Sequence, residues 1–186
     1  MTGGHGGHIE GGDKRTALVI AVLALLLAVV ETGAKASQTE ALSQNVEATN
    51  LWAFYQARTI RQTTANTAVE TAELQKIGMT DEAGRARIEE QQKKWREQIA
   101  TWDSNGRDGR KELTAKARES EQAREHSMAR YHFFEYSAAL LQVAIVIASA
   151  SIITSTPALL FLGIALAAGG AVLGGIGWLN PELFHL

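Results

Sequence analysis

Three uncharged, apolar stretches interrupt an otherwise polar chain. The first, "TALVIAVLALLLAVV" at residues 16–30, follows Lys14 and Arg15. At a rise of ~1.5 Å per residue, a helix of this length nearly crosses a hydrocarbon core of about 30 Å. The chain then carries no charge from Ala138 to Leu179, which is enough for two more crossings, and Pro157 divides them. We therefore predict transmembrane helices at residues 16–33, 138–155 and 158–179.

The first apolar stretch also fits another interpretation. A basic start, an apolar run and the small-residue sequence "AKA" at residues 34–36 are typical of a cleaved signal peptide. We expect an uncleaved signal-anchor instead.

Residues 34–137 have the pattern of long polar helices. From 36 to 77 there is no proline or glycine, and small or apolar residues recur at helical spacing. Members of this series are Leu42, Val46, Thr49, Ala53, Ile60, Ala68, Ala72 and Leu74. Gly78 resembles a helix stop and Thr80 a helix start, so a sharp reversal is predicted at residues 78–80.

A second helix is predicted to run to about Trp102, where the sequence of residues 103–109 breaks it. The chain must then return to the membrane near Ser137. These constraints predict an all-α integral membrane protein with a long antiparallel, coiled-coil-like helical hairpin between the first and second spans. Residues 1–15 are expected to form a flexible Gly/His tail, and residues 180–186 a short tail.

An aromatic group, Trp52, Phe54 and Tyr55, stands in the polar middle of the chain. Trp52 lies about 19 residues beyond the first span, hence roughly 28 Å away along a straight helix. That distance is too large for a membrane-interface belt of aromatic residues. Such side chains suit protein contacts, so we expect them to pack on the returning helix near residues 115–119 or on another subunit.

The segment "SQTEALSQNVEATNLWAFYQARTIRQT" at residues 37–63 resembles the bacterial membrane proteins of the domain of unknown function 4337 family. The stretch "WAFYQAR" at residues 52–58 carries most of the resemblance. The order of an amino-terminal anchor, a charged helical middle and a carboxyl-terminal membrane hairpin is also similar. The resemblance implies this membrane architecture and no assigned activity.

Charge and composition narrow the possible partners. The 186 residues include 18 basic and 20 acidic side chains, a balance that excludes nucleic-acid binding through bulk electrostatics. Lys14 and Arg15 favour a cytoplasmic amino terminus, whereas Lys35, Arg124 and Arg130 favour the opposite orientation. Because long loops cross membranes largely regardless of charge, we expect a bacterial inner-membrane protein with an extracytoplasmic middle domain.

Candidate sites are few. Two weak metal candidates, His5 and His8, lie on a glycine-rich segment that cannot preorganise ligands, so no metal or other cofactor is expected. The small residues of the last span allow close helix contact, either within the chain or between subunits; they are Ala167, Gly170, Ala171, Gly174 and Gly175. Gln142 and Ser149 share one face of the second span and are candidates for a pore or for hydrogen bonds between helices.

The sequence contains no cysteine and shows none of the residue patterns that nucleophilic, acid–base or phosphate-binding catalysis requires. We therefore expect a non-enzymatic scaffold that contacts membrane lipid and self-associates. The alternatives are an accessory subunit bound to a membrane-protein partner, a homo-oligomeric channel lined by the Gln142 face, and a membrane-bound sensor.

Overall fold

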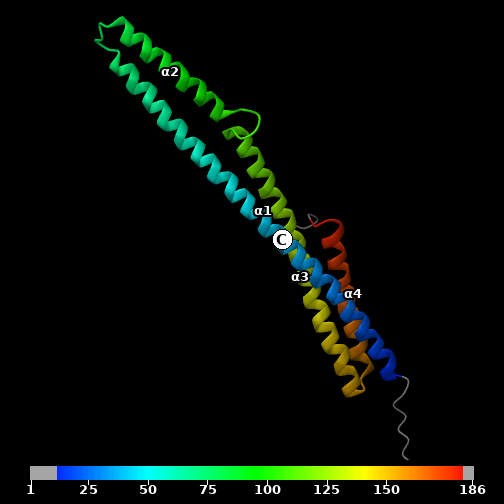
Figure 1. Cartoon of the computed structure of the whole chain (residues 1–186). Helices are drawn as coiled ribbons and strands as arrows, with labels where there is room; N and C mark the ends of the chain where they lie inside the picture. The colour runs from blue at the N-terminus through cyan, green and yellow to red at the C-terminus, as the bar shows by residue number, and fades with distance from the viewer. Residues whose placement is uncertain (1–11, 182–186) are drawn as a thin grey trace, which may run out of the picture. The chain divides into compact units, whose positions relative to one another are not determined.

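The structure is a computed structural model in which residues 12–181 are described, and these residues form four α-helices and no strand (Figure 1). The helices are α1 (Gly12–Gln75), α2 (Glu82–Asp103), α3 (Arg110–Thr154) and α4 (Pro157–Leu179). In α1, α3 and α4 the chain contains stretches that are long and apolar enough to cross a membrane. His5, His8 and residues 182–186 lie outside the described part.

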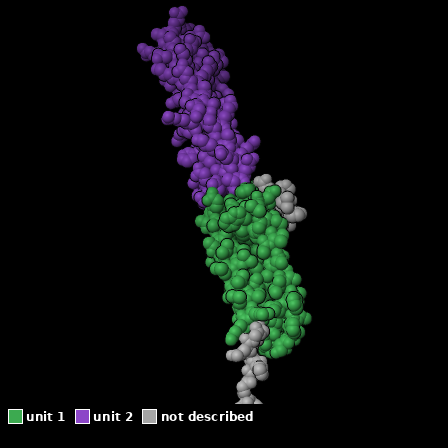
Figure 2. Space-filling view, turned by 90° about the vertical axis from the view of Figure 1, so that its right-hand side faces the viewer, with its two compact units in different colours: residues 1–41, 125–186 green, residues 42–124 purple. Residues whose placement is uncertain are grey.

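The chain divides into two compact units (Figure 2). Unit 1 is Met1–Ala41 with Glu125–Leu186, and unit 2 is Leu42–Arg124. Helices α1 and α3 each contribute residues to both units: α1 runs from an apolar stretch into a polar one, and α3 from a polar stretch into an apolar one.

Helix α1 has no break at Gly33, and it begins at Gly12, so residues 12–15 are helical where we expected flexible tail. Gly33 has a packing role instead. A Cβ placed there would lie 3.2 Å from the ring of Phe134 on α3, so glycine lets the two helices approach closely. Four buried side chains of α1 in unit 1 recur at a spacing of seven, a period that keeps one stripe against its neighbours; they are Thr16, Leu23, Val30 and Ser37, and buried Ala41 follows four residues later.

The core of unit 1 joins α1, α3 and α4. Its buried residues are Leu23, Val30, Phe134, Ala138, Leu141, Ala144 and Ala167. The turn between α3 and α4 uses Ser155, whose φ of 51° is left-handed, and Pro157 opens α4 where a missing N–H costs nothing. The turn therefore falls where Pro157 predicted it.

In unit 2, α2 packs along the second part of α1. Gly78 supplies a left-handed φ of 79° between the two helices, and the Asp81 carboxylate caps α2 by accepting the Ala83 N–H at 3.1 Å. Buried Gln92 of α2 donates to the Val69 carbonyl at 2.8 Å and to Glu73 at 3.1 Å. Apolar burial is sparse here, so this polar contact fixes the pairing of the two helices.

A six-residue connection, residues 104–109, separates α2 from α3. The Asn105 side-chain oxygen accepts the N–H groups of Arg107, Asp108 and Gly109, and its amide donates to Asp108 at 2.6 Å. Gly106 has a left-handed φ of 77°. Because its backbone polar groups are satisfied locally, the connection is a defined turn between two helices.

Candidate interaction site

The aromatic cluster of unit 2 forms where α1 meets α3. Leu51 packs against Leu113 and Ala117, and Trp52 and Tyr55 cover this contact. The rings of Trp52 and Tyr55 meet edge to face with centroids 5.5 Å apart. This arrangement is the favoured geometry for aromatic pairs.

Both polar ends of the cluster have partners. Trp52 Nε1 donates to Glu121 Oε1 at 2.8 Å. The guanidinium of Arg110 lies 5.3 Å from the centroid of the Tyr55 ring, donates to its hydroxyl at 3.3 Å, and also contacts Gln62. The cluster is therefore a contact within one chain, and Trp52 is only partly buried in it.

Phe54 is not part of this cluster. Its side chain is 65% exposed, although it lies two residues after Trp52 and directly before Tyr55. Helical geometry explains the difference, because residues one or two apart point to different faces of a helix.

The small residues of α4 lie on two faces. One face is buried against α3 and includes Ala167, Gly170 and Gly174. A Cβ on Gly170 would be 3.1 Å from the Ser137 carbonyl, and the Ser137 hydroxyl donates to the Gly170 carbonyl at 2.7 Å. These glycines therefore permit backbone contact within the chain.

The other two α4 candidates lie elsewhere. Ala171 is exposed, and Gly175 is partly buried with room for a Cβ, because no described atom comes within 4 Å of that position. Ser137, which sits opposite the buried glycines, was not singled out from the sequence. A lone serine at the end of a polar helix gives no periodic signal.

Gln142 and Ser149 both have local hydrogen bonds. Gln142 Nε2 donates to Glu31 Oε1 of α1 at 3.2 Å, and the Ser149 hydroxyl donates to the carbonyl of Ile145 one turn earlier on α3 at 2.8 Å. Glu31 is an ionisable residue near the end of the first predicted span. The structure places it beside Gln142.

The side of α1 opposite its packed face in unit 2 is exposed, and we call it the outer α1 face. Its residues follow a spacing of three and four; they are Leu42, Val46, Thr49, Ala53, Gln56, Ile60, Thr63, Thr67, Glu70 and Leu74, and all are exposed. Leu42, Ile60 and Leu74 are each more than half exposed. Glu70 is its one charged member.

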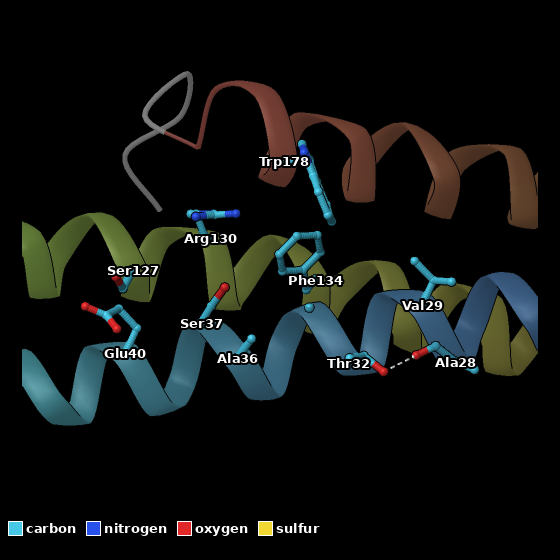
Figure 3. A pocket seen from close by; sticks show the side chains of 11 residues that line it. Ala28, Val29, Thr32, Ala36, Ser37, Glu40, Ser127, Arg130, Phe134 and Trp178 are labelled. Atoms are coloured by element: carbon cyan, nitrogen blue, oxygen red, sulfur yellow. Dashed lines mark hydrogen bonds between the residues drawn. The ribbon is translucent and has the colours of Figure 1, made fainter.

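Unit 1 contains a groove of about 660 Å³, which we call the Arg130 groove (Figure 3). Side chains from α1, α3 and α4 line it, with Phe134 and Trp178 facing each other in an edge-to-face contact at 6.3 Å. Arg130 and Glu40 supply its two charged side chains among residues 12–181. Most of the remaining lining is alanine, valine, glycine and aromatic ring.

The fold defines a class: an all-helical chain with three helices apolar enough to span a membrane. Residues 12–180 match the domain of unknown function DUF4337, and the chain belongs to this family. Neither the curated proteins nor the solved structures include a match to the chain.

Proposed function

We propose that this chain is a three-span membrane protein, with a helical hairpin outside the membrane, that self-associates side by side and acts as a non-enzymatic scaffold. The observation that carries this proposal is the outer α1 face. Helix faces that meet water are normally rich in charged residues, yet nine of the ten positions given for this face are uncharged. A second protein surface is a better partner for such a face than water.

The scarcity of charge, with Glu70 as the one charged residue of the face, favours a second copy of the same chain as that partner. If the spans hold every copy in one orientation, two α1 helices meet in parallel and each residue faces its own equivalent. Any charge on the face would then oppose an identical charge, which is destabilising. A different partner would impose no such restriction, because it could offer the opposite charge.

The spacing of the face also suits a parallel helix pair. Val46, Ala53, Ile60, Thr67 and Leu74 are each seven residues apart, the repeat that lets two helices stay in contact along their length. Threonine and glutamine at intervening positions give a weaker seam than leucine would. This composition fits association that depends on confinement in a membrane.

Disulfide cross-linking of the full chain in native membranes tests the proposal. The protein has no cysteine, so Ile60→Cys introduces a single thiol on the outer α1 face. Mild oxidation should link Ile60→Cys into a dimer of twice 20.1 kDa. The matched control is Gln98→Cys, at an exposed position of α2, which should remain monomeric. Equal cross-linking of the two variants would mean that the dimers form by random collision, and it would contradict the proposal.

Two alternatives give different results in the mass of the complex extracted in native lipid. A scaffold of this kind predicts an integer multiple of the chain mass. A second polypeptide in every complex would make the chain an accessory subunit.

Labelling Ile60→Cys with a membrane-impermeant maleimide on intact cells tests the proposed extracytoplasmic side of the bacterial inner membrane, since only an external thiol reacts.

A further inference from the structure

We propose that the Arg130 groove binds one glycerophospholipid, with the lipid phosphate on the Arg130 guanidinium and an acyl chain along the apolar part of the groove. This inference rests on the membrane location in the proposed function. It does not depend on self-association.

The first argument is the state of Arg130. Its Nε is buried and has no hydrogen-bond partner among residues 12–181. A buried donor without a partner is costly, especially on a charged group. The guanidinium lies at the groove beside the aromatic pair (Figure 3), and it is the side chain best suited to contact a phosphate through several N–H groups.

The second argument is the position of the groove along the three apolar helices. It is lined by α1 from Ala28 to Glu40, by α3 from Ser127 to Phe134, and by Trp178 on α4. The α1 segment includes the predicted span end at residue 33, Trp178 adjoins the end at residue 179, and the α3 segment ends four residues before the predicted start at residue 138. Lipid headgroups lie at this level of a membrane, and tryptophan and arginine are typical residues there.

The third argument is the order of side chains within the groove. In Figure 3, Glu40 and Ser127 lie at one end, Ala28 and Val29 at the other, and Arg130 between Ser127 and Phe134. The order runs from polar to apolar in the direction of the first span. A phospholipid has the same order, from headgroup through phosphate to acyl chain.

Glu40 limits the type of headgroup. Its carboxylate balances the charge of Arg130 within the groove, so the site does not attract anions through bulk charge. A phosphodiester, with one negative charge, can contact Arg130 and extend a hydroxyl-bearing headgroup towards Glu40. A phosphomonoester brings about two negative charges close to the carboxylate and is disfavoured.

Native mass spectrometry of the full chain from mixed phosphatidylcholine and phosphatidylglycerol nanodiscs tests the site. The wild-type chain should retain one phosphatidylglycerol under collisional activation, and Arg130→Gln should lose it, with at least a tenfold fall in the retained fraction. The matched control is Lys35→Gln, because Lys35 is exposed on α1 and borders a different groove, with Glu31 and Gln142. Lys35→Gln should retain the lipid.

A second variant tests the apolar part without removing charge. Ala36 lines the groove and is exposed, so Ala36→Trp should fill the space and displace the lipid while the helix content by circular dichroism stays unchanged. Retention by Arg130→Gln, or equal loss from Arg130→Gln and Lys35→Gln, would overturn the proposal. So would displacement of the lipid by millimolar inorganic phosphate, which would identify a site for free anions.

The outcome also distinguishes a failure of the lipid-binding inference from a failure of the proposed membrane location. If the purified chain fails to enter nanodiscs at all, the membrane location is wrong. If it enters them and Arg130→Gln retains lipid as the wild type does, only the groove assignment fails.

Discussion

At the residue scale, Trp52 shows how one side chain serves two kinds of contact. Its ring packs on Tyr55 and its Nε1 donates to Glu121. Because the indole is partly exposed, its energetic contribution is smaller than that of a fully buried tryptophan. The neighbouring Phe54 makes no comparable contact and is 65% exposed.

Substitutions at these positions should therefore differ. We expect Trp52→Ala to lower the local free energy of unfolding of this region by about 2 to 3 kcal/mol, below the usual range for a buried tryptophan. Trp52→Phe, which removes the hydrogen bond and part of the ring but keeps an aromatic side chain, should cost less, about 1 kcal/mol. Hydrogen–deuterium exchange of the full chain in detergent measures both. Phe54→Ala is the control and should change the local free energy of unfolding by less than ~0.5 kcal/mol.

At the element scale, α1, α3 and α4 share the core of unit 1, and α4 contacts both other helices. A Cβ on Gly174 would lie 3.0 Å from Ser137 Oγ of α3 and 3.5 Å from Val30 of α1, so glycine lets α4 approach both. The same helix carries a glycine that faces open space. Gly177 is close-packed and Gly175 is not, so alanine at Gly177 tests packing and alanine at Gly175 tests helix propensity.

We expect Gly177→Ala and Gly175→Ala to change stability in opposite directions. A Cβ on Gly177 would lie 2.8 Å from Phe133 Cβ, and Phe133 is 2% exposed, so overpacking should cost about 1 to 3 kcal/mol. At Gly175 no described atom opposes the new methyl group, and alanine should add up to ~1 kcal/mol of helix stability. Thermal unfolding in detergent, followed by circular dichroism, distinguishes the two. A shift in the same direction for both variants would contradict this view of the α3–α4 contact.

The pairing of α1 and α2 in unit 2 should depend on pH through Glu73. Hydrogen bonds from Lys76 and then Gln92 lower the pKa of the Glu73 carboxyl. A carboxyl with a lowered folded-state pKa stabilises the fold above its unfolded pKa of ~4.3, and this contribution is lost as pH falls through the folded-state value. At neutral pH the wild-type chain should therefore have a higher melting temperature than the Glu73→Gln variant.

The measurement is the difference in unfolding midpoint between wild type and Glu73→Gln from pH 7 down to pH 3. It should shrink as the solution is acidified. Glu47→Gln, at an exposed position on the same helix, is the control and should show a smaller difference at neutral pH. A difference for Glu73→Gln that is constant with pH would mean that its charge does not stabilise the pairing.

At the scale of the whole molecule, the alternative of a channel can be tested against the scaffold. Gln142 is paired with Glu31, and the Ser149 hydroxyl is satisfied by its own helix. Polar groups with partners hold helices together more often than they line a pore. We expect liposomes that contain the chain to show no ion flux above empty liposomes. Flux that Gln142→Leu reduces would favour the channel.

The apolar helices and the turns between helices could be predicted from the amino-acid sequence. A membrane requires about 20 uncharged residues per helix, and few other environments tolerate such runs, so α1, α3 and α4 could be recognised from composition. Pro157 and Gly78 marked their turns because proline and glycine have distinct backbone preferences. The family of the chain was also recognisable, from the residues around Trp52.

Which helix faces pack against each other could not be predicted from the sequence and is seen only in the folded chain. In unit 2, the apolar Leu42 and Ile60 are exposed while Ala72 is buried, although all three belong to the predicted helical series. Hydropathy could not make this choice, because α1 carries small or apolar residues on opposite sides, and close helix contact selects the side with the smaller or better-fitting residues. The Arg130 groove depends on residues about 100 positions apart in sequence, such as Thr32 and Phe134, and no local pattern connects them.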